Sequence, residues 1–213
     1  MKIGITGATG KLGNWVITKL QEKVSANTIV ALVRTPVKIQ QAGIESRRFD
    51  YNQPDALVAK EAGVKHIVYT SLLKADDSTL VLAPEHLDTE KTIIESGLNY
   101  TILRNGWYNE NYTESVNDTV AQGTLYGSSG DGKITSAARE DYAEAAAVVL
   151  SEESHNNKTY ELSGDLAFTM EEYAVEISKL VGKEIPYVNL SEADFEKALI
   201  EAGLPEPMAA FFS

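Results

Sequence analysis

The chain has 213 residues, of which 43% are hydrophobic and 23% charged, values that suit one substantial globular domain with a small appendage. Its net charge of -12 argues against general nucleic-acid binding, because a polyanion would be repelled, although a locally basic patch remains compatible with it. The absence of cysteine excludes disulfides and a Cys nucleophile and fits a cytoplasmic protein. No long apolar run exists, so we expect no membrane span. The glycine turn begins already at Gly7, so we expect no signal peptide. The histidines at 66, 86 and 155 lack metal-ligand spacing, so we expect no metal site.

Strand and helix patterns alternate along the first half of the chain. Strands are expected at residues 2–6, 28–34, 46–51, 65–73 and 99–106, and helices at 12–24, 55–63 and 84–97. Pro84 and Gly97 are typical of the first and last positions of the third helix. This alternation predicts a parallel sheet with right-handed crossovers and helices on both faces.

The second half changes character. A glycine-rich loop with a short strand is expected at 121–134, one more strand at 158–165, and helices at 139–152, 169–182 and 191–203. Thr169 and Ser191 stand at capping positions of the last two helices.

The predicted fold class is therefore α/β: a doubly wound parallel Rossmann sheet with a small, mostly helical C-terminal lobe on the substrate side. We expect residues 1–106 and 133–168 to form an NADP-binding domain, and residues 107–132 and 169–213 to form the smaller lobe.

Gly7, Gly10 and Gly13 lie directly between the first strand and the first helix. In such a turn the first glycine permits the tight bend, the second lets a pyrophosphate approach the backbone, and the third lets helix and strand pack closely. The helix N-terminus then offers N–H groups and a partial positive charge to the phosphate. The alternative is a glycine-rich connection that binds nothing.

The second strand indicates which dinucleotide binds. An NAD site usually carries an acidic residue at the end of this strand, which binds the ribose 2′-hydroxyl. Here the strand ends at Arg34, Lys38 follows, and no acid lies between them. Two cations pair with a 2′-phosphate, so the cofactor expected is NADPH. Alternatively, Arg34 merely covers the sheet edge.

Several stretches together resemble the atypical short-chain dehydrogenase/reductases, and within them the NmrA-like proteins. These stretches are the glycine turn, "TSLLKAD" (70–76), "LRNGWYNENY" (103–112), "GDGKITSAAREDYAEAA" (130–146) and "YELSGD" (160–165). The resemblance runs through nearly the whole chain. It implies a Rossmann fold and hydride transfer from NADPH to a quinone, as in the bacterial quinone oxidoreductases of that family.

The chain departs from the family pattern at its acid/base pair. No Tyr-x-x-x-Lys occurs anywhere, and alignment places Leu82 at the Tyr position and His86 at the Lys position. Glu90 follows four residues later and shares one helical face with His86. Ordinary ketone reduction or alcohol oxidation is therefore not expected.

The chain is also short between Asp50 and Ala59, where a relative would carry a further helix, strand and loop. A crossover between parallel strands usually needs a dozen or more residues. Either an internal segment and a C-terminal tail are missing from this sequence, or the chain is a true deletion variant whose sheet lacks its fourth strand.

The carboxyl ends of parallel strands meet at one edge of a sheet, where a ligand binds. Asp50 and Tyr51 are placed to flank the adenine, and the resemblance puts Ser71 and Leu72 near the nicotinamide ribose. The residues expected to contact the cofactor are Thr6, Gly7, Ala8, Thr9, Gly10, Lys11, Leu12, Gly13, Arg34, Lys38, Asp50, Ser71, Leu72, Asn105, Gly106, Trp107, Tyr108, Asn109, Glu110, Ala137, Ala138, Arg139, Glu140, Asp141 and Tyr142.

Three parts of this set have competing interpretations. Trp107 and Tyr108 would form a flat wall for an aromatic substrate, or they would pack between the two lobes. Residues 137–142 would contact the cofactor, or Glu140 and Asp141 would simply complement a helix dipole. His86 is the candidate catalytic residue: it would bind the nicotinamide ribose, supply a proton, or be a half-exposed helix residue with no role.

The favoured function is NADPH-dependent reduction of quinones. Hydride addition to a quinone gives an anion stabilised by aromaticity, so the missing tyrosine acid matters little. The alternatives are a non-catalytic NADP(H)-binding redox sensor of the NmrA-like type and, against the missing tyrosine, a nucleotide-sugar epimerase or dehydratase. The expected partner is a small-molecule quinone, and a homodimer is compatible with the sequence.

Overall fold

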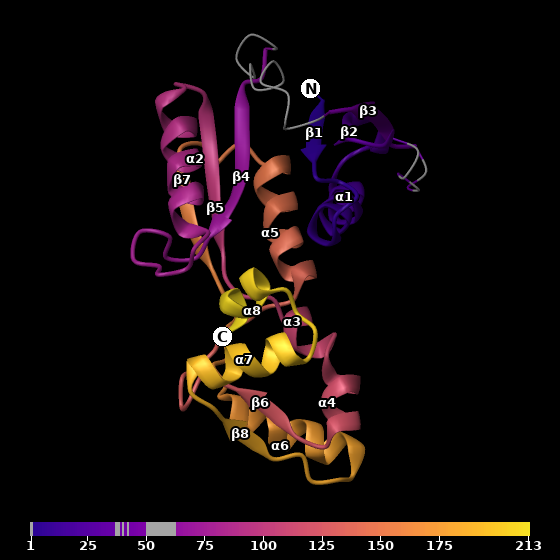
Figure 1. Cartoon of the computed structure of the whole chain (residues 1–213). Helices are drawn as coiled ribbons and strands as arrows, with labels where there is room; N and C mark the ends of the chain where they lie inside the picture. The colour runs from indigo at the N-terminus through magenta and orange to yellow at the C-terminus, as the bar shows by residue number, and fades with distance from the viewer. Residues whose placement is uncertain (1, 37–38, 40, 42, 50–62) are drawn as a thin grey trace. The chain divides into compact units, whose positions relative to one another are not determined.

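The computed structural model describes residues 2–36, 39, 41, 43–49 and 63–213, which form two compact units (Figure 1). The first unit comprises Met1–Ser78, Leu82–Gly106 and Ala138–Leu162, and the second comprises Thr79–Val81, Trp107–Ala137 and Ser163–Ser213. Residues 79–81, 133–137 and 163–168, expected in the nucleotide-binding domain, fall in the second unit.

Parallel strands form the first unit, as the alternating pattern predicts. One three-stranded sheet has the order β1 (Ile3–Thr6), β2 (Ile29–Val33), β3 (Glu45–Arg48), and the other has the order β4 (His66–Leu72), β5 (Asn99–Asn105), β7 (Lys158–Leu162). All neighbouring strands in both sheets are parallel. The expected helix at 55–63 and the end of the expected strand at 46–51 lie outside the described residues, apart from Gly63.

Helices cover the second of these sheets on both faces. Val68 of β4 packs into the cluster that contains α1 (Lys11–Lys23) and α5 (Arg139–Ser151), whereas Tyr69 and Ser71 bind side chains of α2 (Ala83–Glu95). Successive strand residues point to opposite faces, so α2 lies on the face opposite to α5. The doubly wound α/β prediction is thus confirmed.

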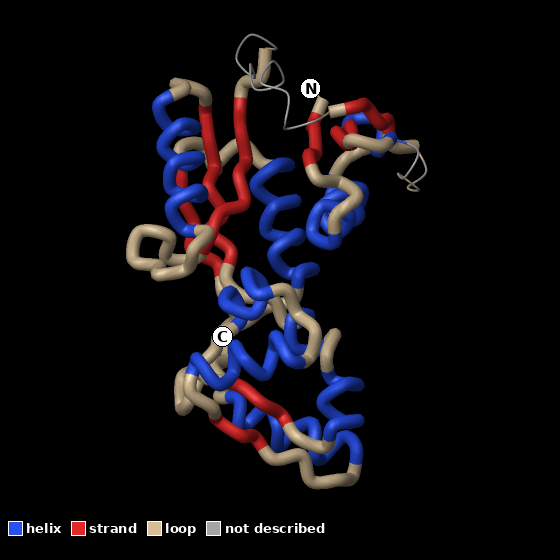
Figure 2. Tube along the Cα trace, viewed as in Figure 1, coloured by secondary structure: helices blue, strands red, loops and turns tan. Residues whose placement is uncertain are grey.

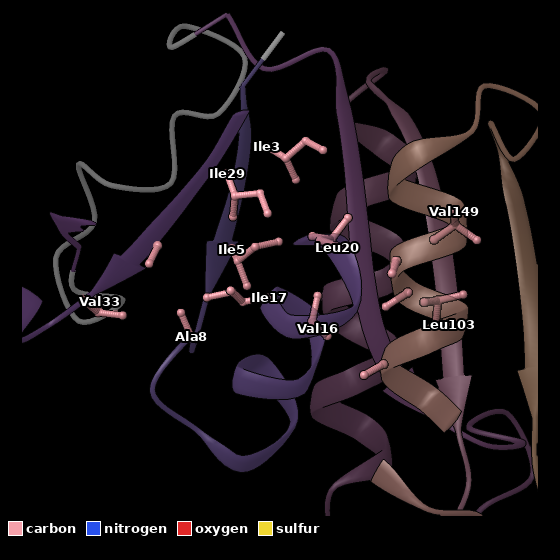
Figure 3. Packing of buried hydrophobic residues seen from close by; sticks show 14 residues of the cluster. Ile3, Ile5, Ala8, Val16, Ile17, Leu20, Ile29, Val33, Leu103 and Val149 are labelled. Atoms are coloured by element: carbon pink, nitrogen blue, oxygen red, sulfur yellow. The ribbon is translucent and has the colours of Figure 1, made fainter. Parts of the chain in front are cut away.

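A single apolar cluster joins the two sheets (Figure 3). Val16, Ile17 and Leu20 form the inner stripe of α1 and pack under β1, and Leu103 brings in β5. Fully burying a side chain such as Ile17 stabilises the fold by about 2 kcal/mol. Within the described residues, β1 is paired with β2 alone and β4 with β5 alone. The link between the two sheets in this part of the chain is therefore side-chain packing.

Helices α1 and α5 lie side by side, as Figure 1 shows. The inner face of α5 carries the buried residues Ala143, Ala146 and Ala147. At the rim of this contact, Lys19 pairs with Glu140 at 2.6 Å and Lys23 pairs with Glu144 at 2.7 Å. The alanine-rich sequence of α5 is therefore explained by close helix packing.

The second unit is mostly helical, as Figure 2 shows, but it also contains a short sheet. Its helices are α3 (Glu110–Thr113), α4 (Val116–Gln122), α6 (Met170–Val181), α7 (Glu192–Glu201) and α8 (Glu206–Phe212). Strands β6 (Leu125–Gly127) and β8 (Tyr187–Asn189) pair in parallel. The sequence predicts β6 but not β8.

The predicted caps of α6 and α7 are confirmed. The hydroxyl of Thr169 accepts a hydrogen bond from the backbone N–H of Glu172, whose carboxylate accepts one from the N–H of Thr169. The hydroxyl of Ser191 accepts a hydrogen bond from the N–H of Asp194.

Candidate nucleotide site

The glycine turn between β1 and α1 is closely packed. Gly7 has a φ of 60°, a left-handed conformation that favours glycine, and its carbonyl accepts a hydrogen bond from the N–H of Gly10 at 2.8 Å. A Cβ atom at Gly13 would lie 2.3 Å from the Gly7 carbonyl oxygen. Gly13 therefore allows α1 to start directly on the turn.

The start of α1 is suited to an anion. Helix α1 is capped at Gly10 without any side-chain hydrogen bond, and no acidic residue occupies its first turn. Thr9, Gly10 and Lys11 are exposed. Backbone N–H groups and the helix dipole at such an end bind phosphate, so the residues present fit a dinucleotide.

Arg34 is exposed and directly follows β2, one strand away from the glycine turn. Among the described residues it makes no ion pair. Binding of a 2′-phosphate by its exposed side chain stays a prediction. Lys38, Asp50 and Tyr51, the other residues predicted at the adenosine end, lie outside the described residues.

Asn105 ends β5 and is 4% exposed. Neither polar atom of its side-chain amide has a hydrogen-bond partner within the part of the chain that the structure describes. A buried amide without partners costs free energy, so a ligand that supplies a donor and an acceptor would bind favourably there. This side chain fits the predicted cofactor contact.

The side chain of Ser71 points toward α2. Its hydroxyl is buried and donates a hydrogen bond of 2.5 Å to Glu90 on α2. Glu90 in turn accepts two hydrogen bonds from Arg104 of β5. The side chain of Ser71 thus has a structural partner, and the cofactor contacts of Ser71 and Leu72 stay a prediction. Arg104 is not among the site residues predicted from the sequence.

His86 lies on the first turn of α2, at a distance of 2.8 Å between its Nδ1 and the hydroxyl of Tyr69. The two rings are 5.8 Å apart and both residues are partly buried. Glu90, although on the same helical face, binds Ser71 and Arg104 instead. Leu82, at the position of the family's tyrosine, is 43% exposed.

Tyr69 was missed by sequence reasoning, although a signal for it exists. Residues 69 and 71 share one face of β4 by strand alternation. That face is the one that meets the helix with His86. A tyrosine therefore does stand beside His86, but it comes from the strand and not from the helix.

Gly106 lets the chain pass closely by its neighbours at the end of β5. A Cβ atom there would lie 3.1 Å from the hydroxyl of Tyr142 and 3.2 Å from the Leu162 carbonyl oxygen. Tyr142 is 3% exposed and thus belongs to the packing beneath this strand end.

The residues after Gly106 are organised within the second unit. Trp107 contacts Phe211 and Phe212 of α8, with ring centroids 6.1 Å and 6.4 Å away. Tyr108 forms a bridge with Ala137, and Asn109 accepts a hydrogen bond of 2.6 Å from the hydroxyl of Ser136. The aromatic surface of Trp107 therefore extends into the C-terminal helix, which sequence reasoning did not foresee.

The acidic residues at the start of α5 have structural partners. The carboxylate of Asp141 accepts a hydrogen bond from the N–H of Ala138, and Glu140 pairs with Lys19. Arg139 is 9% exposed. These contacts agree with the dipole interpretation of the two acids, while cofactor binding by residues 137–142 stays a prediction.

Neither metals nor membranes are indicated by the described residues. Among them, no group of three or more His, Cys, Asp or Glu side chains is arranged to hold a metal ion. In the same part of the chain, no helix combines the length and apolarity needed to cross a bilayer.

A family model described as the NmrA-like family matches residues 51–213. The chain belongs to the NmrA-like family. It is 47% identical to Quinone oxidoreductase 2 of Escherichia coli K12, with 97% of this chain and 84% of that protein covered. The predicted family membership is thereby confirmed.

Two solved structures show the same fold with a bound cofactor. The NADPH complex of the NADPH-dependent quinone oxidoreductase from Escherichia coli gives a TM-score of 0.94 at 46% identity, covering 98% of this chain and 86% of that one. The NADP(H) complex of triphenylmethane reductase from Citrobacter sp. gives a TM-score of 0.95 at 34% identity, covering 100% and 87% of the two chains.

The NmrA-like relatives carry internal residues that this chain lacks. The alignment with the Escherichia coli protein spans 240 positions, although this chain has 213 residues. The extra positions fall inside the aligned range and so are gaps within this chain. They agree with the predicted internal shortening, whose expected place between Asp50 and Ala59 lies outside the described residues.

Proposed function

We propose that this NmrA-like protein reduces quinones by hydride transfer from NADPH. The observation that carries the proposal is the 47% identity to Quinone oxidoreductase 2 of Escherichia coli across almost the whole chain. The fit of the glycine turn and of Asn105 to a dinucleotide supports it. The function favoured by the sequence agrees with this relative.

The cofactor residues divide into two groups. We propose that the turn from Thr6 to Gly13 and the start of α1 hold the pyrophosphate, with Arg34 and Lys38 on the 2′-phosphate. At the other end, Asn105 offers the N–H groups and the carbonyl oxygen of its amide to the nicotinamide part, and the backbone of Leu72 lies beside it. When bound, NADPH supplies the hydride from C4 of its nicotinamide ring.

His86 is the proposed source of the proton that completes the reduction. If the hydroxyl of Tyr69 donates to Nδ1 of His86, the neutral imidazole carries its own proton on Nε2. As Nε2 gives that proton to the hydroquinone anion, Nδ1 takes the hydroxyl proton of Tyr69, so the imidazole stays neutral and the tyrosine is reprotonated from solvent. A quinone needs only such a weak donor, because its reduced anion is stabilised by aromaticity.

Trp107 is the proposed wall of the quinone site. It follows β5 and Gly106 directly in the chain, two residues after Asn105. Its aromatic contacts with Phe211 and Phe212 extend the flat apolar surface that a quinone ring would meet.

The test measures NADPH oxidation by purified protein across a panel of benzoquinones and naphthoquinones, with His86→Ala and Trp107→Ala alongside. We expect turnover with the wild-type protein, a fall of about 10- to 100-fold in kcat for His86→Ala, and mainly a raised KM for Trp107→Ala. His155→Ala is the matched control, because His155 lies near Thr101, toward the opposite ends of the strands.

The competing function is an NADP(H)-binding redox sensor without catalysis. Similar affinities for NADP⁺ and NADPH, with no NADPH consumed by any quinone of the panel, would replace the reductase proposal with this one. An epimerase or dehydratase is disfavoured, because Leu82 stands where its tyrosine acid/base is required.

A homodimer and a cytoplasmic location are further parts of the proposal. The cysteine-free composition supports the location, and analytical ultracentrifugation decides the oligomeric state.

A further inference from the structure

An ion cluster built around Arg104 lies at the carboxyl ends of the strands in the second sheet. The Nε and Nη2 atoms of Arg104 donate hydrogen bonds of 3.0 Å and 2.7 Å to the two carboxylate oxygens of Glu90. Its Nη1 donates to Asp76 at 2.5 Å and to Glu161 at 3.0 Å. Arg104 is 9% and Glu90 5% exposed. We call these four residues and Ser71 the Arg104 cluster.

The cluster connects most elements around this strand end. Arg104 belongs to β5 and Glu161 to β7, and Glu90 comes from α2. The hydroxyl of Ser71 on β4 donates to Glu90, so the third strand is included. Only a planar guanidinium with several donors can serve three carboxylates in this way, because lysine offers a single point charge.

Contacts with this cluster and with the end of β5 hold the backbone of Leu73 and Lys74, which follow β4. The N–H of Leu73 donates to the Asn105 carbonyl at 2.9 Å, and the N–H of Lys74 donates to Glu161 at 2.8 Å. Lys74 has a φ of 50°, which is unfavourable for a residue with a Cβ atom. Such a conformation persists where surrounding contacts hold it, and Glu161 and the Arg104–Asp76 pair supply those contacts.

We propose that Arg104 is a positioning residue for the nicotinamide end of the cofactor. It acts through the backbone from Leu72 to Lys74 and through the end of β5 at Asn105, and it need not touch the cofactor itself. The inference rests on the proposed function, which places the nicotinamide end at these strand ends. The adenosine end depends on β1 and β2, which belong to the other sheet and have no member in the cluster.

The experiment compares two ligands on Arg104→Lys and Asp76→Asn by isothermal titration calorimetry. NADPH reaches both ends of the site, whereas 2′,5′-ADP carries the adenosine and its 2′-phosphate but no nicotinamide. We expect Arg104→Lys to weaken NADPH binding by about 10-fold and 2′,5′-ADP binding by less than about 2-fold. For Asp76→Asn, which alters the 65% exposed arm of the cluster, we expect an intermediate loss of about 3-fold for NADPH alone.

Glu95→Gln is the matched control, since Glu95 is an exposed carboxylate at the far end of α2. Equal losses for the two ligands, or unchanged NADPH affinity in folded Arg104→Lys protein, would overturn the inference. If Arg104→Lys does not fold, the affinities of Asp76→Asn and Glu161→Gln for NADPH and for 2′,5′-ADP test the inference instead. Wild-type protein that binds 2′,5′-ADP as tightly as NADPH would also overturn it, because the nicotinamide end would then add nothing.

These binding measurements remain decisive when no quinone is reduced. In that case the reductase proposal fails, while the difference between the two ligands still reports whether Arg104 positions the nicotinamide end.

Discussion

The space around Gly13 is too small for a Cβ atom. A Cβ atom there would lie 2.3 Å from the Gly7 carbonyl oxygen, so the turn or the helix would have to move. Alanine in place of a helical glycine otherwise stabilises a helix, so any loss reports the clash. For Gly13→Ala we expect a loss of about 10-fold or more in NADPH affinity and about 1–3 kcal/mol in the free energy of unfolding.

The measurements are fluorescence titration with NADPH and denaturant unfolding. Thr18→Ala, five residues further along α1, is the control and is expected to keep wild-type affinity. Unchanged NADPH binding by Gly13→Ala would show that the turn is not the phosphate site.

Arg34 determines the choice between the two nicotinamide cofactors if it binds the 2′-phosphate. Replacing it by Glu puts a negative charge beside that phosphate while leaving a carboxylate that suits a ribose hydroxyl. We expect Arg34→Glu to weaken NADPH binding by about 100-fold and to change NADH binding by less than about 3-fold. Equal losses for both cofactors, measured by the same titration, would refute this role.

His66 makes the stability of the fold depend on pH. Burial lowers the pKa of His66 below its ordinary value of 6.5, and the nearby His155 lowers it further. Its Nε2 lies 2.9 Å from the hydroxyl of Thr101, which itself donates to the His155 carbonyl. Since the fold disfavours the protonated form, the unfolded chain takes up the proton first as the pH falls.

We therefore expect the free energy of unfolding to be fully retained above about pH 6.5 and to decrease below it, until the lowered pKa of His66 is passed. In His66→Gln, whose amide can still donate to Thr101, this decrease should become shallower. Urea unfolding at pH 7.5, 6.5 and 5.5 measures it, and identical slopes in both proteins would exclude His66 as the cause.

Sequence spacing gave correct positions for residues whose role depends on the backbone. The glycine turn and the caps at Thr169 and Ser191 are examples, because their residue types are required by local geometry. The partners of Ser71 and Trp107 could not be obtained in this way. Glu90 and Phe211 lie 19 and more than 100 residues away from them in the chain, and only the tertiary fold brings them together.

At the scale of elements, α6 depends on a reciprocal cap at its N-terminus. The Thr169 hydroxyl and the Glu172 carboxylate each accept a backbone N–H that would otherwise lack an intrahelical partner. We expect Thr169→Ala to lower the free energy of unfolding by about 1 kcal/mol, and Thr169→Ser to restore most of it. Chemical denaturation checks both, and equal stabilities of the Ala and Ser variants would contradict the assignment.

The elements themselves were largely predictable, with two kinds of exception. Long periodic segments such as α1 and α5 have a clear apolar stripe or an alanine-rich face, and they occur where expected. Strand β8 covers only Tyr187–Asn189 and helix α8 only Glu206–Phe212, too few residues for a periodic signal. Helix α3 begins at the end of the "NGWYNE" stretch and α4 comes shortly after it, and the polar residues there give no apolar pattern that would predict where these helices begin.

At the scale of the whole molecule, a dinucleotide would contact both sheets of the first unit. The glycine turn and Arg34 follow β1 and β2, whereas Asn105 and the Arg104 cluster belong to β4, β5 and β7. Within the described residues these sheets are joined by the packing of α1 and α5. NADPH binding should therefore stabilise the folded first unit beyond what either end contributes alone.

The division of the first unit into two sheets has a consequence for the cooperativity of unfolding. Without ligand, the β1–β2–β3 part is joined to the rest by one packed interface as far as residues 2–36, 39, 41, 43–49 and 63–213 show, and it is expected to open at a lower free energy than the β4–β5–β7 part. Hydrogen exchange should show this as faster exchange at Ala31 than at Ile102, although both residues are buried. Saturating NADPH should bring the two rates together, so that the cofactor converts two partly independent sheets into a single cooperative body.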